Sequence, residues 1–348
     1  MLYTTTPTSV MSEADRASCA GQLLPVRRTR RVGILINPKS GRNRDGLHGL
    51  LRVLEPYETA VCQYVVGPAS VAAALAAMAA QNVDVVGICG GDGTVQAALT
   101  ALLHNGPFTV LPSLALIAGG TTNMTAGDVG MEGKPIQALE RLLAWAEGRG
   151  PTAQLVRRAV LRVDGGTDST PRFGMFFSAA GIAQVTRVRH VTRRRAKSRL
   201  MRGAVGTAVT VGRYLLGLAL RRRVVEPTPI TVRLDDKPYE TRDYLALFIT
   251  TLARLNPGIR PYWGREDGPL KYTAVADQPQ GLLRAPPALL SGRPSRRLIP
   301  ESGYTSRNIH EAVLQLKTAC TLDGQILINR PPHSLTVSYG GEVDFVRV

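Results

Sequence analysis

Residues 83–103 read VDVVGICGGDGTVQAALTALL, which places a strand, a glycine-rich turn and a helix one after another. The apolar run 83–88 predicts a buried strand, and residues 95–103 predict a helix that follows at once. Between them, residues 90–94 hold three glycines and one carboxylate, that of Asp92. A strand that turns sharply into a helix is the repeating unit of α/β proteins with a parallel sheet.

The glycine-rich turn also has the composition of a phosphate-binding site. Glycine lets the backbone approach phosphate oxygens closely and adopt unusual φ angles. The start of the following helix offers N–H groups and the positive end of a helix dipole. The alternative is an ordinary strand–helix turn in which Asp92 or Thr94 caps the helix. Three glycines in four residues exceed what a cap requires, so the turn favours a polyphosphate ligand.

The first half of the chain repeats this alternation of strands and helices. Strands are predicted at 31–36, 60–65, 83–88 and 113–118, and helices at 47–54, 70–80, 95–103 and 135–148. The alternation predicts a doubly wound parallel sheet. Two further polar turns, 37–43 and 119–123, each follow a predicted strand. Because ligands of open α/β sheets bind at the carboxyl ends of the strands, we expect all three turns to face one site.

The pattern changes near residue 150. Short alternating segments follow, separated by turn signals such as Asp323-Gly324, and they predict an antiparallel β domain. The sequence therefore predicts a two-domain protein of α/β plus all-β class. The expected parts are a flexible tail at 1–31, an α/β domain at 32–150 and a β domain at 151–348, with a basic helical insert at 187–223, a mobile loop at 278–300 and a last strand at about 335–348 that could return to the first domain.

The net charge of +17 favours polyanionic partners. Segment 187–223 holds twelve Arg or Lys residues and no Asp or Glu, and its middle is apolar. Apolar residues flanked by arginines suit attachment to an anionic membrane, at about 1 kcal/mol per cation near the surface. A solvated basic face is the alternative. Nucleic acid is not expected, because the segment lacks interleaved aromatic residues that stack on bases.

The cysteines and the apolar runs indicate the compartment. Cys19, Cys62, Cys89 and Cys320 are scattered, so they form neither a metal-binding pair nor a disulfide framework. Residues 1–31 lack the apolar core of a signal peptide, and no run reaches the ~20 apolar residues of a membrane span. We therefore expect a cytoplasmic protein that associates peripherally with a membrane.

Three blocks of residues, taken in this order, resemble the catalytic family of the diacylglycerol kinases, which includes bacterial lipid kinases and the sphingosine and ceramide kinases. The blocks are 37–41 (NPKSG), 90–94 (GGDGT) and 120–126 (GTTNMTA). Residues 322–325 (LDGQ) resemble a later Asp-Gly-Glu motif of the family. The resemblance extends over about 32–346.

The resemblance implies an α/β nucleotide-binding domain, a β-sandwich lipid domain and an active site between them. It implies a role in lipid metabolism, with Mg²⁺-dependent transfer of the γ-phosphoryl group of ATP to a hydroxyl of a diacylglycerol-like or sphingoid lipid. Asp323 is the implied general base and Asp92 is the rival candidate, while the metal ligands stay open. The implied ATP-binding residues are Asn37, Pro38, Lys39, Ser40, Gly41, Gly90, Gly91, Asp92, Gly93, Thr94, Gly120, Thr121, Thr122 and Asn123.

The chain also departs from the family's pattern. Met124 stands where Asp commonly follows Asn, Gln325 replaces the Glu of Asp-Gly-Glu, and 181–186 (GIAQVT) replace a Gly-x-Asp-Ala-like block. Each departure leaves a neutral side chain where a carboxylate, the usual Mg²⁺ ligand, is common. A weak or inactive nucleotide or lipid sensor on the same fold is therefore an alternative. An NAD kinase is a further alternative, disfavoured because 122–125 (TNMT) lack that family's acidic motif. The sequence leaves the acceptor lipid and the oligomeric state open.

Overall fold

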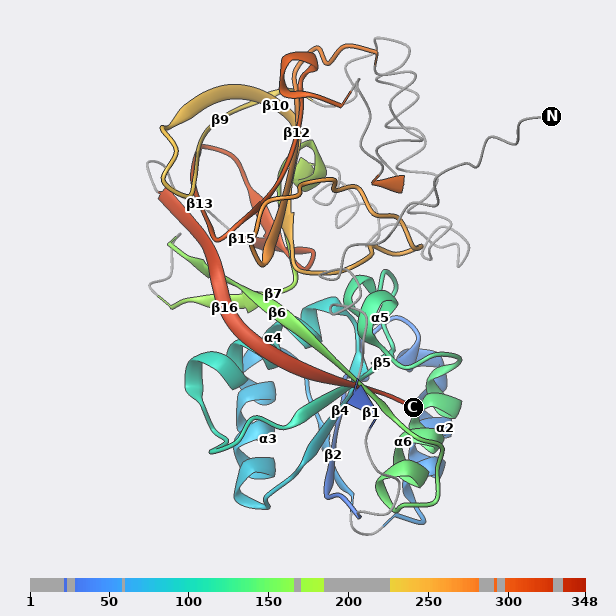
Figure 1. Ribbon diagram of the computed structural model, residues 1–348. Coiled ribbons are helices and arrows are strands. Elements are labelled where there is room, and N and C mark those ends of the chain that lie inside the picture. The colour runs from blue at the N-terminus through green and yellow to red at the C-terminus, as the bar shows by residue number, and fades with distance from the viewer. Residues whose placement is uncertain are drawn as a thin grey trace, which may run out of the picture.

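The computed structural model describes residues 22–23, 29–57, 60–165, 170–184, 226–281, 291–292, 298–327 and 334–348. Figure 1 shows an α/β half, in which helices cover a parallel sheet, and a half built of antiparallel strands. The basic insert expected at 187–223 lies outside the described residues, as does most of the loop expected at 278–300.

The sheet of the α/β half is parallel. Its strands are β2 (Val32–Ile36), β3 (Val61–Tyr64), β4 (Val85–Gly90) and β5 (Ser113–Ala118), in the order β5-β4-β2-β3. All residues of β2 and β4 are buried, as expected for strands covered on both faces. The predicted α/β part of the fold is thus confirmed.

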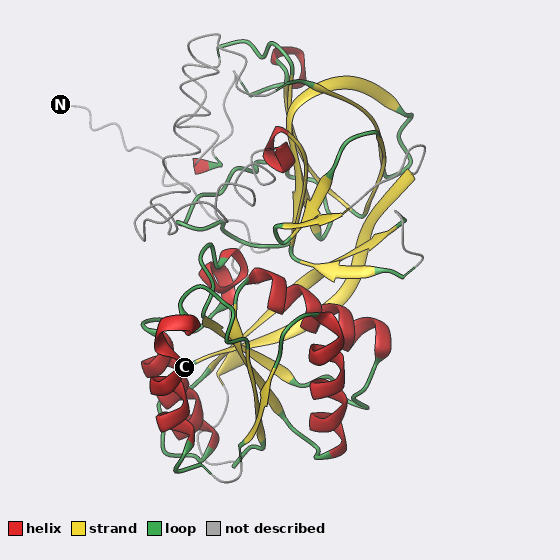
Figure 2. Ribbon diagram, turned by 180° about the vertical axis from the view of Figure 1, so that it is seen from behind, coloured by secondary structure: helices red, strands yellow, loops and turns green. Residues whose placement is uncertain are grey.

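Two pairs of helices cover the two faces of this sheet. They are α2 (Asn43–Leu54) with α6 (Pro135–Ala146), and α3 (Pro68–Ala80) with α4 (Asp92–Thr100). Successive residues of a strand point to opposite faces, so Ile34 packs in the core beneath α2 and α6, whereas Leu35 packs in the core beneath α3 and α4. Figure 2 shows the two pairs on opposite sides of the sheet.

The turn between β4 and α4 is shorter than the sequence predicted. Gly90 stays in β4 because it pairs with Ala118 of β5, and α4 starts at Asp92, three residues before the predicted start. Gly91 is therefore the only residue between the two elements, and it is the N-cap of α4. At its other end, α4 continues into a π-helical turn, η1 (Ala101–Asn105).

The antiparallel half encloses a hydrophobic core of its own, with Phe177, Leu247 and Leu314 among its buried residues. In it, β10 pairs with β8, β9 and β11, and every strand pair within this half is antiparallel over the described residues. The strands are β6 (Gln154–Asp164), β7 (Arg172–Gly174), β8 (Phe176–Ala180), β9 (Thr228–Leu234), β10 (Glu240–Thr250), β11 (Leu270–Ala276), β12 (Tyr304–Ile309), β13 (Glu311–Leu316), β14 (Cys320–Leu322) and β15 (Gln325–Leu327), and a 3-10 turn, η3 (Pro300–Ser302), precedes β12.

One long strand, β16 (Ser334–Arg347), joins the two halves. It pairs with β6 along most of its length and with β13, and its end lies parallel to β5, where Phe345 pairs with Leu114. Figure 1 shows β16 and β6 running together from one half into the other. The carboxyl edge of the parallel sheet is thereby held against the antiparallel half.

The segment expected to be a tail contains a short strand, β1 (Gln22–Leu23), which pairs with the start of β6. Among the described residues, no helix is both long and apolar enough to cross a membrane.

Candidate functional site

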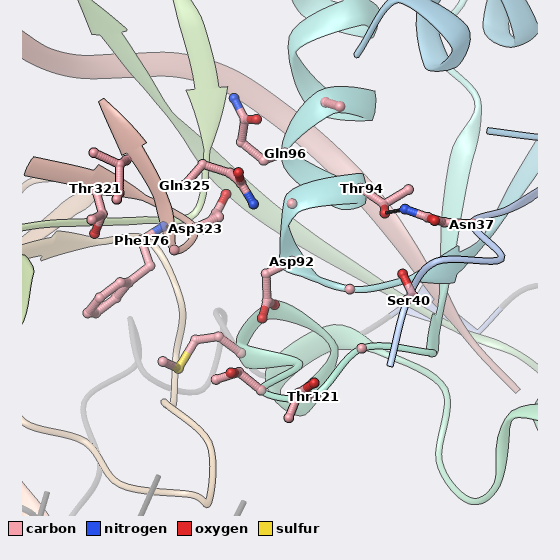
Figure 3. Close-up of a pocket in the computed structure, with 18 of the residues that line it drawn as sticks. Asn37, Ser40, Asp92, Thr94, Gln96, Thr121, Phe176, Thr321, Asp323 and Gln325 are labelled. Atoms are coloured by element: carbon pink, nitrogen blue, oxygen red, sulfur yellow. Dashed lines mark hydrogen bonds between the residues drawn. The ribbon is translucent and has the colours of Figure 1, made fainter. Parts of the chain in front are cut away.

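A cavity of about 640 Å³ lies at the carboxyl edge of the parallel sheet, between the two halves. The α/β half contributes Asn37, Lys39, Ser40, Gly41, Gly67, Pro68, Val71, Gly91, Asp92, Gly93, Thr94, Gln96, Ala97, Gly120, Thr121, Thr122 and Met124. The antiparallel half contributes Arg172, Phe176, Ser178, Gly181, Ile182, Thr321, Asp323, Gly324, Gln325 and Ile326. Figure 3 shows Asp92 and Asp323 extending into the cavity from different halves.

The start of α4 forms one wall of the cavity. Residues 91–94 all line it, and the backbone N–H of Thr94 donates to the carbonyl of Gly91, 2.9 Å away, which closes the first turn of the helix. The positive end of the α4 dipole therefore faces the cavity, and the glycines beside it leave the backbone accessible. This geometry suits an anion such as a phosphate group.

Hydrogen bonds tie the first polar turn to α4 and to the third turn. The Asn37 amide donates to the hydroxyl of Thr94, 2.9 Å away, as Figure 3 shows. The backbone N–H of Arg42 donates to the carbonyl of Gly119 at 2.8 Å. The buried Asn43 amide donates to the carbonyls of Cys89 and Asn37. The three turns expected to face one site are thus joined directly to one another.

Three of the predicted binding residues do not line the cavity. Gly90 is the buried end of β4, where a Cβ would collide with the side chain of Thr94. Asn123 adopts the left-handed conformation, and its side chain both accepts from the N–H and donates to the carbonyl of Gly120. Pro38 completes the first turn. Gly90 and Asn123 shape the backbone of the site, and the other eleven predicted binding residues line the cavity.

Asp92 is the first residue of α4 and is half-buried in the cavity wall. One carboxylate oxygen accepts the backbone N–H of Thr125, 3.1 Å away, at the start of α5 (Met124–Val129). Burial raises the pKa of Asp92, while hydrogen bonds from the backbone of Met124 and Thr125 oppose the rise. The carboxylate thus faces the cavity and also fixes the start of α5.

Asp323 reaches the same cavity from the turn between β14 and β15 and is only 4% exposed. Its carboxylate accepts the backbone N–H groups of Met175 and Phe176 at 2.9–3.2 Å. A Cβ on Gly174 would collide with this carboxylate, so glycine is required there. Burial raises the pKa of Asp323 well above its usual range, and the charge of Asp92 raises it further.

Gln325 lies between the two halves. A Cβ on Gly93 would collide with its amide nitrogen, so the side chain rests on the first turn of α4. Figure 3 shows the amide pointing from the antiparallel half toward α4. The neutral residue that replaces a carboxylate of the resembled motif is therefore placed beside both Asp92 and Asp323.

Sequence reasoning missed several residues around the cavity, and two groups of them show why. Gly67 is the N-cap of α3, and Pro68 and Val71 lie in its first turn. β3, which precedes them, also ends at the carboxyl edge of the sheet, so the same edge argument could have found them. Ser178 and Thr321, whose hydroxyls are 2.7 Å apart, come from β8 and β14. These two strands pair although they are far apart in the sequence, and no local pattern signals that pairing.

The described residues offer few carboxylate ligands for a metal ion. Among them, no group of three or more His, Cys, Asp or Glu side chains could hold a metal. Mg²⁺ often binds through one or two carboxylates together with substrate phosphates and water. Asp92 and Asp323 both line the cavity, so the donor set fits Mg²⁺ only as an ion shared with a bound phosphate.

Comparisons with known proteins agree with the resemblance. Residues 31–153 match the family model described as diacylglycerol kinase catalytic domain. No curated protein matches the chain.

Among solved structures, a putative diacylglycerol kinase from Bacillus anthracis str. Sterne has a TM-score of 0.60 and 16% identity, covering 92% of this chain and 96% of that chain. A second, also named a putative diacylglycerol kinase from that strain, has a TM-score of 0.59 and 15% identity, covering 92% and 97%. A third, named a diacylglycerol kinase from the same strain, has a TM-score of 0.56 and 16% identity, covering 90% and 96%. The predicted resemblance is therefore confirmed: residues 31–153 match the diacylglycerol kinase catalytic domain family, and the described chain shares the fold of these bacterial proteins.

Proposed function

We propose that this protein is an ATP-dependent lipid kinase that transfers the γ-phosphoryl group of ATP to a hydroxyl of a diacylglycerol-like or sphingoid lipid. One observation carries the proposal. A single cavity holds the glycine-lined start of α4 with Asp92 on one side and the buried carboxylate of Asp323 on the other. The match of residues 31–153 to a kinase catalytic domain supports it.

The α/β side of the cavity is where ATP would bind. The start of α4 and the turns at 37–41 and 120–122 offer a helix dipole, hydroxyls and the cation of Lys39 to the phosphates. Pro68, Val71 and Ala97 provide an apolar wall for the base. These residues bind and orient the nucleotide, which is most of what phosphoryl transfer requires of a protein.

The antiparallel half, for which we propose a β-sandwich arrangement, would hold the lipid acceptor. Phe176, Ile182 and Ile326 are apolar, and the Ser178–Thr321 hydroxyl pair is polar. Asp323 would take the proton of the acceptor hydroxyl at its carboxylate oxygen. Burial raises its pKa, which makes the carboxylate a stronger base than an exposed one.

Mg²⁺ would neutralise negative charge on the phosphates when it is bound. Asp92 is the residue that would hold it, because this carboxylate stands at the start of α4 in the cavity wall. Asp323 is more deeply buried and lies on the antiparallel side of the cavity, and this position suits proton transfer from a lipid hydroxyl better. This division of roles favours Asp323 over Asp92 as the general base.

We also propose that the protein is cytoplasmic and that its arginine-rich segment, 187–223, contacts an anionic membrane. The described residues on either side of 185–225 lie together, because the Gln184 amide donates to the carbonyl of Glu226 at 3.0 Å. Ile182, which lines the cavity, lies just before this stretch. The described residues that precede this segment therefore lie on the acceptor side of the cavity, where a lipid from a membrane would enter.

The decisive experiment is transfer of label from γ-labelled ATP into a total lipid extract, followed by identification of the labelled product. Wild-type protein should label a hydroxyl-bearing lipid when Mg²⁺ is present, and Asp92→Ala should abolish the labelling. Asp236→Ala, which removes an exposed carboxylate in the turn after β9, is the matched control and should leave it unchanged. An Asp92→Ala protein as active as wild type would refute the assignment.

A sensor that binds nucleotide or lipid without turnover is the second candidate function. Met124 and Gln325, both neutral, line the cavity near the two carboxylates. Binding of ATP with no labelled product across a broad lipid panel would favour the sensor over the kinase.

A further inference from the structure

Residues 253–256, here called the latch, lie between β10 and β11 and reach from the antiparallel half to α5. Figure 1 shows α5 at the boundary between the two halves. We propose that Asn256 is a positioning residue: through the latch it holds the turn before α5, and hence the nucleotide side of the cavity, in its binding geometry. This inference rests on the proposed function.

The latch makes three hydrogen bonds to α5 and the turn before it. The Asn256 amide donates to the carbonyl of Thr122 at 2.7 Å. The Arg254 side chain donates to the carbonyl of Gly127 at 3.1 Å, and the N–H of Ala253 donates to the carboxylate of Asp128 at 2.9 Å. A Cβ on Gly127 would lie 3.1 Å from the Cβ of Asn256, so the two backbones pack closely there.

The latch is itself held rigidly. Leu252 and Leu255 are buried in the core that also contains Val129 of α5. Backbone hydrogen bonds between Leu255 and Ile259 close a tight turn after Leu255. The Asn256 side chain therefore leaves a fixed backbone, and its amide presents a fixed donor to Thr122.

A buried ion pair also holds α5 in place. The Arg158 guanidinium lies 3.0 Å from the carboxylate of Asp128, and the two side chains are 9% and 3% exposed. The same carboxylate oxygen accepts the N–H of Ala253. β6, α5 and the latch thus meet at the buried carboxylate of Asp128. This contact both stabilises the fold and positions α5.

The held segment reaches the proposed nucleotide site. Thr121 and Thr122 line the cavity, and the N–H of Thr125 donates to Asp92. α5 has only six residues, and a helix this short has little stability without tertiary contacts. Asn256 does not itself line the cavity, so it acts through the carbonyl of Thr122. It is the latch side chain whose removal should move this turn without breaking the buried ion pair.

The test compares Asn256→Asp with Asn308→Asp. Aspartate keeps the shape of asparagine but replaces the donor with an oxygen, which faces the Thr122 carbonyl unfavourably. The Asn308 amide also donates to a backbone carbonyl, that of Glu266 at 2.9 Å, but within the antiparallel half. Both variants therefore lose the same kind of hydrogen bond and gain the same charge.

Two measurements decide the outcome: the dissociation constant of Mg·ATP by calorimetry, and amide hydrogen exchange over residues 120–127. We expect Asn256→Asp to bind Mg·ATP about 10-fold more weakly, as the loss of one hydrogen bond plus a repulsion implies, and to exchange faster over 120–127. Asn308→Asp should match wild type in both. Unchanged exchange over 120–127 in Asn256→Asp would overturn the proposal. If wild type binds no nucleotide, the proposed function fails, and the exchange comparison still decides the role of the latch.

Discussion

A Cβ atom on Gly120 would lie 2.5 Å from the Cα of Gly91, so the second and third polar turns are in direct backbone contact. The reverse distance, from a Cβ on Gly91 to the Cα of Gly120, would be 3.1 Å. Neither residue has a positive φ, and the need for glycine comes from this close approach. The contact brings Thr121 beside the start of α4, and the proposed phosphate site depends on it.

Gly120→Ala should therefore displace the third turn from α4. We expect a loss of about 1–3 kcal/mol of stability from overpacking and nucleotide binding weakened at least about 10-fold. Gly46→Ala is the control, because a Cβ there meets nothing within 4 Å in α2. It should stabilise the protein by about 0.5–1 kcal/mol. Denaturant unfolding and calorimetry measure both effects, and equal behaviour of the two variants would contradict the contact.

Asp323→Asn should separate stability from activity. The pKa of Asp323 is raised in the folded protein. At a pH between the unfolded and the folded pKa, the native state therefore holds a proton that the unfolded state has lost. Stability therefore falls as the pH rises from about 3.9, the unfolded value, through the folded pKa. Asparagine tolerates the φ of +48° at this position and keeps an acceptor for Met175 and Phe176.

We expect Asp323→Asn to lose kinase activity by at least about 100-fold. Its thermal midpoint, measured in the presence of EDTA, should decline less than that of wild type between about pH 4 and pH 8. A variant with the wild-type pH dependence of stability would show that this carboxyl does not titrate as described.

Arg158→Leu tests the buried charge at the latch. The variant leaves the buried Asp128 with only the longer ion-pair contact to Arg254, 4.0 Å away, which should cost about 3–5 kcal/mol of unfolding free energy. The adjacent Arg157 pairs with Asp344, but its side chain is 63% exposed, so Arg157→Leu should change stability little. Urea unfolding of both variants measures the difference, and similar losses would argue against the buried pair.

Gln325→Glu tests whether the cavity accepts a third carboxylate. The new carboxylate would lie against Gly93, near Asp92 and Asp323. In the absence of metal, repulsion between these like charges should lower the stability of the protein. A bound cation should offset this loss. We expect the rise in thermal midpoint on adding Mg²⁺ to exceed that of wild type. Gln137→Glu, at an exposed position of α6, is the control. An unchanged response to Mg²⁺ would place residue 325 too far from the ion.

The sequence alone determined the α/β half and the three polar turns. Apolar runs followed by glycine-rich turns and helices are local patterns, because burial and backbone conformation are encoded over a few residues. Those patterns located Gly91, Asp92 and Thr94 at the site, and the family resemblance added Asp323. The start of α4 was predicted three residues late, because Gly90 remains in the strand through its pairing with β5.

Only the tertiary structure decided which of these residues share a cavity and what surrounds them. Asp92 and Asp323 meet because β14 pairs with β8 while β16 joins the antiparallel half to the parallel sheet. The latch contact between Asn256 and Thr122 likewise joins segments far apart in the chain. Such contacts depend on long-range packing of whole faces, and no short pattern of residues encodes them.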